Sequence, residues 1–410
     1  MALAVFVFCT SRKRIFLLSY LDAACFRDLN SRGHFAMSDN YKIISSDSHV
    51  IEPWYLWQER LPQEFRDRAP KLVSGENGDR LVCEDVEMPP IGTAAGVFRK
   101  NSEVRQTGRW EDDVPASSYD PGARIAELER DGIWGEVMYP TFGLGFYGID
   151  DVKFKWALLR AYNDWLAEFC QYDPKRYKGI AMVANDDPEL AAEELRRVKK
   201  LGLVGVMIPT VAGEGVPQYH ERGMDPLWKA AVDNGMSVNV HSGTTRDRNK
   251  KSAVLQVSGG RNPTKSPLKY EVIVRPMLNM IFGGVFERFP ELTFVSAENE
   301  AGWAPHVLER ADYEWERYAN VALKDFESRI PRPPSDYFRK NIKLTFLRDS
   351  VAILSRHLFG VETIMFQTDF PHGVSTYPNS RKMVDDMFAG IDTADRDKIV
   401  YQNAADLYGF

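Results

Sequence analysis

The most constraining feature of the sequence is a regular alternation of short apolar runs with longer amphipathic segments. Eight such runs occur from residue 41 onward: Tyr41–Ser46, Gly135–Tyr139, Gly179–Val183, Val204–Ile208, Ser237–Val240, Leu292–Ser296, Ile342–Phe346 and Thr363–Gln367. A strand followed by a helix, repeated along the chain, predicts a parallel sheet. Eight units suit a closed barrel. The sequence therefore predicts an α/β fold, a (β/α)8 TIM barrel.

The segments between the runs predict helices at Pro121–Asp131, Val152–Cys170, Pro188–Leu201, Tyr270–Phe289 and Gly302–Trp315. Two connections are long. The stretch 51–120 is rich in Pro and Gly with only weak strand signals, and it predicts an insertion after the first strand. The stretch Gly243–Pro267 is long and polar. Because the loops after the strands build the active site of such barrels, this second stretch predicts a lid.

Residues 1–36 differ in pattern from the rest of the chain. Two apolar runs flank the basic triplet Arg12–Arg14, whereas a signal peptide places its charges before the apolar region. Met37 is followed by a polar triplet and then by the first strand. We therefore expect Met37 to be the natural start, residues 1–36 to be an upstream extension outside the fold, and residues 37–410 to form one barrel. A targeting peptide is the alternative for residues 1–36.

Composition excludes several classes of protein. The chain has 410 residues, 44% of them hydrophobic, and a net charge of −6. An acidic balance disfavours a nucleic-acid or anionic-membrane surface, and no run of eighteen apolar residues predicts a membrane span. The cysteines, Cys9, Cys25, Cys83 and Cys170, form no CxxC pair, as is typical of a reducing compartment. We expect a cytoplasmic protein that binds a small-molecule substrate, no nucleic acid and no membrane, and that forms a homodimer or a higher homo-oligomer.

Imidazoles and carboxylates stand at the ends of several predicted strands. Asp47 and His49 end the first, His241 ends the fifth, and Asp369 ends the eighth, with His372 on the following turn. Residues two apart on a strand point to the same side, so Asp47 and His49 can converge. Strand ends of a parallel barrel share one face, and these side chains suit Zn²⁺, Fe²⁺ or Mn²⁺. The sequence therefore predicts a divalent-metal site, with zinc expected first.

Glu298 follows the sixth predicted strand at the same kind of position. Its carboxylate could complete the metal site or act as a general acid or base beside it. The alternative is a salt-bridged carboxylate that holds a loop, for example one paired with Arg310.

The segment Gly143–Gly148 matches the G-x-G-x-x-G pattern of dinucleotide-binding loops. Such a loop must open a helix whose N-terminus faces phosphate, but Asp150 and Asp151 precede the next helix and would repel it. We therefore interpret the segment as an aromatic wall over the barrel mouth, with a surface turn of partly buried aromatics as the alternative. Residues near predicted strand ends suggest an aromatic or bulky apolar substrate; those assigned to substrate binding are Trp54, Trp57, Phe142, Phe146, Tyr147, Phe370 and His372.

Several ordered motifs resemble those of the amidohydrolase-related family, in the branch that includes aminocarboxymuconate-semialdehyde decarboxylase and the resorcylate-type decarboxylases. They cover nearly all of residues 41–410 and include Asp47-Ser48-His49 with Glu52-Pro53, Pro121–Arg124, Tyr162–Trp165, Pro226–Trp228, Phe289–Leu292, Thr368–His372 and Asn403–Gly409.

The resemblance implies a (β/α)8 barrel with a metal at its C-terminal face. It implies that His49, His241 and Asp369 are metal ligands and that Asp47 occupies a ligand position where His or Glu is usual. Many decarboxylases of the family carry a His after the sixth strand as proposed proton donor, and this chain has Glu298 there. No Lys ends the fourth strand, Val204–Pro209, so a carbamylated-lysine site with two metals is not supported.

Four functions follow from these residues. The first is a metal-dependent hydrolase, in which Asp47, His49, His241, Asp369 and Glu298 surround the metal and Asp369, Glu298 and His241 carry out catalysis through a metal-activated water. The second is a non-oxidative decarboxylase of an aromatic or unsaturated acid. The third is an oxygenase, because a carboxylate-rich site suits iron. The fourth is an inactive binding or scaffold protein, against which the intact ligand set argues.

Overall fold

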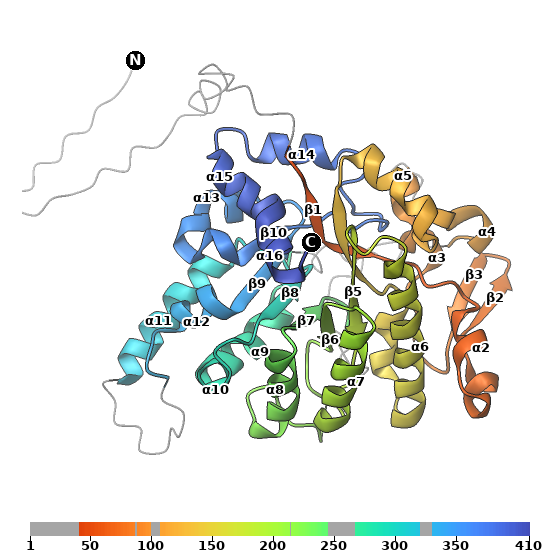
Figure 1. The fold of residues 1–410 in the computed structure, drawn as a ribbon, viewed down its shortest axis with the longest axis horizontal. Helices are drawn as coiled ribbons and strands as arrows, with labels where there is room; N and C mark the ends of the chain where they lie inside the picture. The colour runs from red at the N-terminus through yellow and green to blue at the C-terminus, as the bar shows by residue number, and fades with distance from the viewer. Residues whose placement is uncertain (1–40, 87, 100–106, 214, 245–266, 320–329) are drawn as a thin grey trace, which may run out of the picture. The chain divides into compact units, whose positions relative to one another are not determined.

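Eight parallel strands form the centre of the fold, and the predicted (β/α)8 barrel is confirmed (Figure 1). In order around the sheet they are β1 (Ile44–His49), β4 (Gly135–Tyr139), β5 (Tyr177–Met182), β6 (Gly205–Ile208), β7 (Ser237–His241), β8 (Phe294–Ala297), β9 (Ile342–Phe346) and β10 (Ile364–Phe366). Each of the eight predicted runs contributes one strand. Their residues are almost all buried, as expected of strands covered on both faces.

The computed structural model describes residues 41–86, 88–99, 107–213, 215–244, 267–319 and 330–410. Lys42–Phe410 forms one compact unit. The predicted extension, residues 1–36, lies outside the described residues, and so does most of the predicted lid, residues 245–266.

The first and last strands close the barrel. Ser46 Oγ donates to the carbonyl of Phe366 over 2.7 Å, and the backbone N–H of Asp369 donates to the carbonyl of Asp47 over 3.0 Å. The N–H of His49 donates to the carbonyl of Phe370 over 2.6 Å. These bonds form a seam between β1 and β10 at the end of the barrel where the predicted metal ligands lie.

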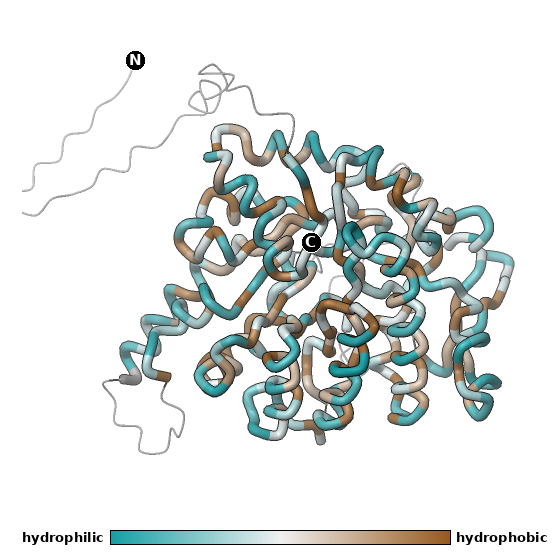
Figure 2. Tube along the Cα trace, viewed as in Figure 1, coloured by the Kyte–Doolittle hydropathy of each residue, from teal (hydrophilic) through white to brown (hydrophobic). Residues whose placement is uncertain are grey.

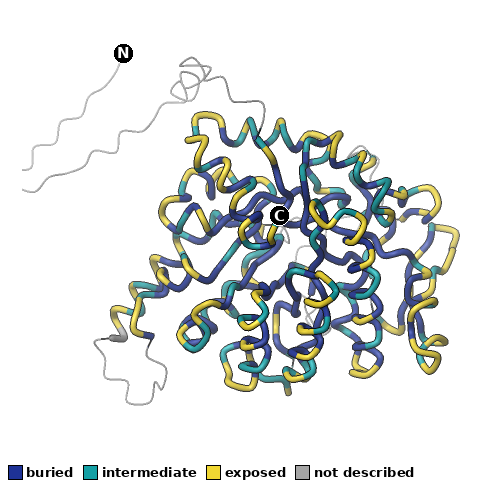
Figure 3. The backbone as a smooth tube through the Cα atoms, in the orientation of Figure 1, coloured by how far each residue is buried: buried dark blue, intermediate teal, exposed yellow. Residues whose placement is uncertain are grey.

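Helices cover the outside of the barrel. They are α5 (Pro121–Asp131), α6 (Val152–Gln171), α7 (Pro188–Lys200), α8 (Asp225–Asp233), α9 (Glu271–Phe282), α10 (Val285–Arg288), α11 (Ala304–Ala319), α12 (Pro334–Asn341), α13 (Ser350–Phe359), α14 (Ser380–Met387), α15 (Thr393–Asp397) and α16 (Asn403–Tyr408). Their outward faces are hydrophilic and exposed, and the strands inside them are buried (Figures 2 and 3).

Local sequence explains where these helices begin and end. Asp120 and Asp187 cap α5 and α7 through their side chains, and a proline follows each at the first helical position. The predicted helix Tyr270–Phe289 is divided into α9 and α10, because Gly284 adopts a positive φ of 69° between them.

The first connection, between β1 and β4, contains several short elements before α5. They are α2 (Leu56–Arg60), η2 (Gln63–Arg68), β2 (Lys71–Gly75), β3 (Gly78–Val82), α3 (Ile91–Ala94), η3 (Gly96–Phe98), α4 (Trp110–Asp113) and η4 (Ala116–Ser118). Strands β2 and β3 pair as an antiparallel hairpin outside the barrel. Most of its residues are exposed or half-buried, which explains its weak strand signal.

Short helical turns complete the chain: η5 (Gly143–Gly148), η6 (Arg222–Met224), η7 (Val361–Thr363) and the π-helical turn η8 (Lys398–Gln402). Among the described residues, no helix combines the length and the apolar character that crossing a membrane requires.

Candidate metal centre

Four buried side chains converge at the C-terminal ends of the strands. We call Asp47, His49, His241 and Asp369 the floor of the site. His49 Nε2 lies 3.6 Å from Asp47 Oδ1 and 3.3 Å from Asp369 Oδ1, and His241 Nε2 lies 3.5 Å from Asp47 Oδ2. All four side chains are at most 1% exposed. The structure thus brings together four of the five predicted ligands.

The backbone dictates this convergence. Asp47 and His49 are two apart on β1, which the seam joins to the segment carrying Asp369, and His241 ends β7. The second ring nitrogen of each histidine is anchored: His49 Nδ1 lies 2.8 Å from the carbonyl of Pro140, and His241 Nδ1 lies 2.7 Å from that of Ser242. Each imidazole therefore turns its Nε2 toward the floor, in the arrangement usual for metal-binding histidines.

The inward atoms of the floor make no hydrogen bond to any residue that the structure describes. Both carboxylate oxygens of Asp47, both of Asp369, and the Nε2 atoms of His49 and His241 are buried and make no hydrogen bond. Buried polar atoms are nearly always satisfied, because leaving one without a partner costs about 1–3 kcal/mol. Six such atoms within one cluster indicate a missing common partner. Imidazole nitrogen and carboxylate oxygen suit divalent Zn, Fe or Mn, so the residues fit such an ion.

Electrostatics within the floor support this conclusion. Burial raises the pKa of Asp47 to about 6, although His241 opposes the change. Burial alone would lower the pKa of His241, but the carboxylates of Asp47 and Glu298 outweigh it and raise the value to about 9. Burial, with the neighbouring His372 and His241, lowers the pKa of His49 well below its usual range. Without an ion, burial disfavours the ionised carboxylates of the cluster. A divalent cation would stabilise both of them.

Three partly exposed groups surround the floor, and we call Glu298, His372 and Lys269 the rim. Their side chains are 15%, 20% and 21% exposed. His372 stacks on His49 with ring centroids 4.0 Å apart, and its Nδ1 lies 3.1 Å from Asp369 Oδ1. Its Nε2 lies 3.2 Å from Thr141 Oγ1. His372, assigned to substrate binding from the sequence, thus lies directly beside the predicted ligands.

Glu298 is held away from the inward atoms of the floor. Its two oxygens accept from Lys269 Nζ and Ser242 Oγ, and its Oε2 lies 3.8 Å from His241 Nδ1, the ring nitrogen facing away from the cluster. The expected alternative, a salt-bridged carboxylate, is therefore what the structure shows, but with Lys269 as the partner. Arg310 pairs with Glu314 instead. Burial alone would raise the pKa of Glu298, but Lys269 and His241 lower it well below its usual range.

Backbone strain concentrates at this site. Glu298, Glu300 and Asp369 have positive φ angles of 61°, 56° and 56°, and the only other non-glycine residue with a positive φ in the described chain is Glu84. A non-glycine residue with such a φ angle costs about 1–3 kcal/mol of free energy, which the surrounding contacts must offset. Such strain is typical of sites where a side chain must point in one functional direction.

Most of the aromatic residues assigned to substrate binding are packed into the structure. Trp57 is fully buried, its ring packs against Phe146, and its Nε1 donates to the carbonyl of Leu158 over 3.1 Å. Tyr147 is also buried and donates to the carbonyl of Met207 over 2.6 Å. Phe142 is fully buried beside Trp110. These contacts account for the four aromatics by packing alone.

Trp54 and Phe370 occupy different surroundings. Trp54 is half-buried with its ring against Tyr55. Phe370 is 3% exposed and packs between the Arg124 guanidinium and the ring of Tyr377. Segment Gly143–Gly148 forms η5, a 3-10 helix, and α6 starts only at Val152 with Asp151 as its cap. The dinucleotide interpretation is therefore excluded, and the aromatics of this segment are fully rather than partly buried.

The sequence assigned no role to two fully buried carboxylates, Glu52 and Glu136. Glu52 accepts the backbone N–H groups of Thr141, Phe142 and Gly143 over 3.2, 2.9 and 2.8 Å. Burial raises its pKa to about 7, although these three bonds oppose the change. Its partners are backbone groups, so no side-chain pattern reveals them. The motif Glu52-Pro53 was the only signal.

The second carboxylate, Glu136, forms a bidentate pair with Arg124 over 2.6 and 2.8 Å, and both side chains are fully buried. Arg124 also approaches the carbonyl of Phe370 to 3.5 Å, and that carbonyl accepts the N–H of His49. This pair therefore supports the seam beneath the floor.

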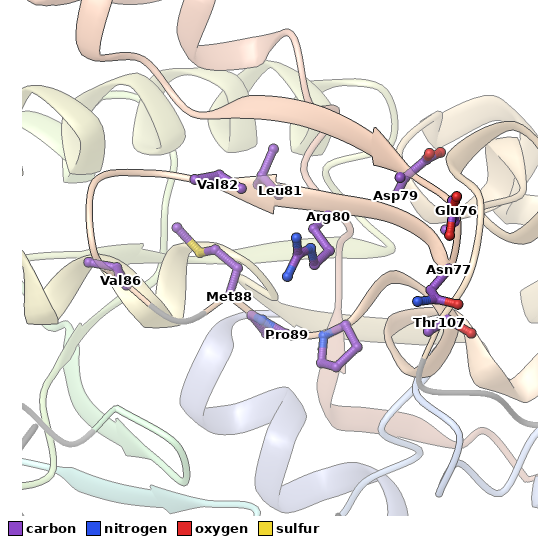
Figure 4. Close-up of a pocket in the computed structure, with 13 residues that line it drawn as sticks. Glu76, Asn77, Asp79, Arg80, Leu81, Val82, Val86, Met88, Pro89 and Thr107 are labelled. Atoms are coloured by element: carbon purple, nitrogen blue, oxygen red, sulfur yellow. The ribbon is translucent and has the colours of Figure 1, made fainter.

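A cavity of about 710 Å³ lies elsewhere, along the hairpin (Figure 4). Its walls include Asp79, Arg80 and Met88, and none of the floor or rim residues lines it. Residue 87 and residues 100–106, which border these walls in the chain, lie outside the described residues. The cavity and the candidate metal centre are thus separate features of the described chain.

Comparisons with known proteins identify relatives of this chain and solved structures with the same fold. Gamma-resorcylate decarboxylase from Rhodococcus jostii (strain RHA1) is 30% identical over 268 residues, 61% of this chain and 76% of that protein. The crystal structure of an amidohydrolase from Mycobacterium avium subsp. paratuberculosis K-10 is also similar, with a TM-score of 0.71 and 24% identity. The match covers 90% of this chain and 98% of that chain. The 5-carboxyvanillate decarboxylase of Novosphingobium aromaticivorans, in complex with manganese and 4-hydroxy-3-methoxy-5-nitrobenzoic acid, matches 91% of this chain and 97% of its own, with a TM-score of 0.64 and 18% identity.

The family model described as Amidohydrolase matches residues 138–410, which include β5 to β10. The match also includes four of the floor and rim positions identified from the sequence: His241, Glu298, Asp369 and His372. Together with the relative that is 30% identical, this match confirms the resemblance inferred from the motifs. The chain belongs to the amidohydrolase family.

Proposed function

We propose that the protein is a divalent-metal-dependent, non-oxidative decarboxylase of an aromatic acid. The observation that carries the proposal is the floor: four buried ligand side chains whose inward atoms lack partners, at the end of the barrel where such enzymes place their active site. The decarboxylase relatives support this reaction over the hydrolysis that we expected first.

Asp47, His49, His241 and Asp369 would hold the ion, and when bound it would supply positive charge to the oxygens of a substrate carboxylate. Manganese is our preferred ion, because carboxylate oxygen suits it and because the 5-carboxyvanillate decarboxylase structure contains manganese. Zinc, expected first from the sequence, and iron are the other candidates that metal analysis would distinguish.

Decarboxylation breaks one carbon–carbon bond, releases CO2 and requires a proton on the carbon that loses it. Among the rim groups, we assign this proton to His372. Burial alone would lower the pKa of His372, but the carboxylates of Asp369 and Glu298 raise it above its usual value. Glu298 has a lowered pKa and already accepts two hydrogen bonds, so its part is to hold Lys269 and Ser242. Thr141, 3.2 Å from His372 Nε2, orients the ring.

A metal-dependent hydrolase is the second candidate. The observation that favours it is Glu298, which stands where many decarboxylases of the family carry a histidine. The floor residues would then hold an ion that supplies positive charge to a substrate carbonyl, and Asp369 would act as ligand and general base.

The test begins with protein purified without a tag and without added metal, whose metal content is measured. Manganese-loaded protein is then incubated with hydroxylated benzoates and, separately, with aryl esters and amides. We expect CO2 release with formation of the decarboxylated phenol, and none from His241→Ala. Acid release from the esters or amides without CO2 would favour the hydrolase. Two bound irons with oxygen consumption would favour the oxygenase.

A further inference from the structure

The rim contains a cation that neither the sequence motifs nor the family resemblance assigns. Lys269 lies two residues before α9, and its Nζ donates to Glu298 Oε1. Its side chain is 21% exposed, so it is neither free in solvent nor sealed in the core. The ammonium group is therefore partly accessible and paired with Glu298 beside the floor.

The position of this cation is fixed by its partner. Glu298 accepts from Lys269 with one oxygen and from Ser242 with the other. Its backbone N–H donates to Thr345 Oγ1 over 2.9 Å, and its φ is 61°. Because Glu298 Oε2 also lies 3.8 Å from His241 Nδ1, one carboxylate separates the Lys269 ammonium from a floor ligand.

The pairing leaves Lys269 with capacity for a ligand. An ammonium has three N–H donors. Among the described residues, its recorded hydrogen bond is the one to Glu298, which leaves two donors. A substrate oxygen that reached them would gain a charge-assisted bond in a partly desolvated place, where such bonds are strong.

We propose that Lys269 determines substrate specificity by binding a second acidic group of the substrate, while the first lies against the floor. This inference rests on the proposed function and narrows it: the substrate class is an aromatic acid with two anionic or acceptor groups, such as a carboxylate and a phenolate, on different positions of the ring. The alternative role, in which Lys269 only neutralises Glu298, predicts no such discrimination.

Two chromophoric probes test this proposal. The first is 4-hydroxy-3-methoxy-5-nitrobenzoic acid, and the second is 2-methoxy-6-nitrophenol, the same molecule without its carboxyl group. Both absorb visible light as nitrophenolates, so their dissociation constants for the manganese-loaded full chain follow from absorbance titrations. The variants are Lys269→Met, Lys269→Arg and, as a matched control, Lys340→Met, which removes a lysine that pairs with Glu291 on the surface over 2.8 Å.

We expect the unmodified protein and Lys340→Met to prefer the carboxylated probe. Lys269→Met should lower that preference about tenfold or more, the usual worth of a charge-assisted hydrogen bond, with its manganese content unchanged. Lys269→Arg should keep part of the preference. An unchanged preference in Lys269→Met, or equal binding of both probes by the unmodified protein, would overturn the role of Lys269 alone. Binding of neither probe would overturn the proposed aromatic substrate and the inference with it.

Discussion

Two ionic clusters lie fully buried at the barrel, and they differ in completeness. Arg124 and Glu136 satisfy one another with two hydrogen bonds, and Arg124 also reaches the carbonyls of Ser117 and Phe370. The floor shows the opposite, because the inward atoms of Asp47 and Asp369 make no hydrogen bond within the described chain. A complete buried cluster needs nothing from outside the chain. An incomplete one indicates a ligand that the chain does not encode.

We expect the largest effect from variants that remove an imidazole from the floor, the incomplete cluster. His49→Ala and His241→Ala should each abolish metal retention, because a site of about four ligands rarely survives loss of an imidazole. Metal analysis after dialysis would measure this. His357→Ala, which removes an exposed imidazole that lies 3.2 Å from Asp395, should keep full occupancy. Full metal content in both floor variants would place the site elsewhere.

The next largest effect should follow from breaking the complete cluster, the Arg124–Glu136 pair. Arg124→Met leaves the Glu136 carboxylate buried and unpaired, which should cost about 3–5 kcal/mol of unfolding free energy. Urea denaturation would measure the loss, and Arg124→Met combined with Glu136→Leu should recover much of it. Arg60→Met, which removes an exposed pair with Glu168, should cost about 0–1 kcal/mol. Equal losses in the two single variants would contradict the distinction drawn here.

A smaller effect tests whether Glu298 is a metal ligand of the floor or a residue of the rim. Glu298→Gln should leave metal content unchanged, because the Glu298 oxygens contact Lys269 and Ser242 rather than the inward atoms. Turnover should fall about 10–150-fold, the worth of one charge-assisted hydrogen bond of about 1.5–3 kcal/mol. Metal analysis and steady-state rates on one preparation separate the two properties. Loss of the ion from this variant would make Glu298 a ligand.

The smallest effect is a pH dependence of stability. Burial raises the pKa of Glu52 from 4.5 to about 7, so the folded protein binds this proton more tightly than the unfolded chain. The stability that this proton contributes is present below about pH 4.5 and is lost as the pH rises through about 7. Glu52→Gln should therefore lose stability less steeply between these values.

Denaturation at several pH values gives the two slopes. Glu59→Gln, the same change at an exposed position of α2, serves as the control and should follow the unmodified protein. Parallel curves for Glu52→Gln and the unmodified protein would contradict the raised pKa.

The barrel was predictable from the sequence for a physical reason. Strands buried on both faces must be apolar along their length, so runs such as Val204–Ile208 are conspicuous, and β2 and β3 are not because they are largely exposed. The floor was predictable because strand ends share one face of the barrel. This argument needs only the position of each residue along its strand.

The rim and the supporting pair were not predictable in this way. Lys269 reaches Glu298 from a segment 29 residues away in the chain, and its position depends on loop geometry that no local pattern encodes. The aromatic residues failed as a guide for a different reason. Trp57 and Phe146 lie near strand ends, but their large apolar rings are stabilised by packing on each other and α6.

The seam between β1 and β10 has a consequence for how a cell makes this protein. Asp47 and His49 leave the ribosome with the first strand of the barrel, and Asp369 leaves with the last. The nascent chain carries two of the four potential ligands until His241 is made and three until Asp369 is made, so the complete site would form only after the last strand. An ion bound there then joins the earliest and latest strands to be made, and it would hold the barrel shut against the local opening that degradative proteases require.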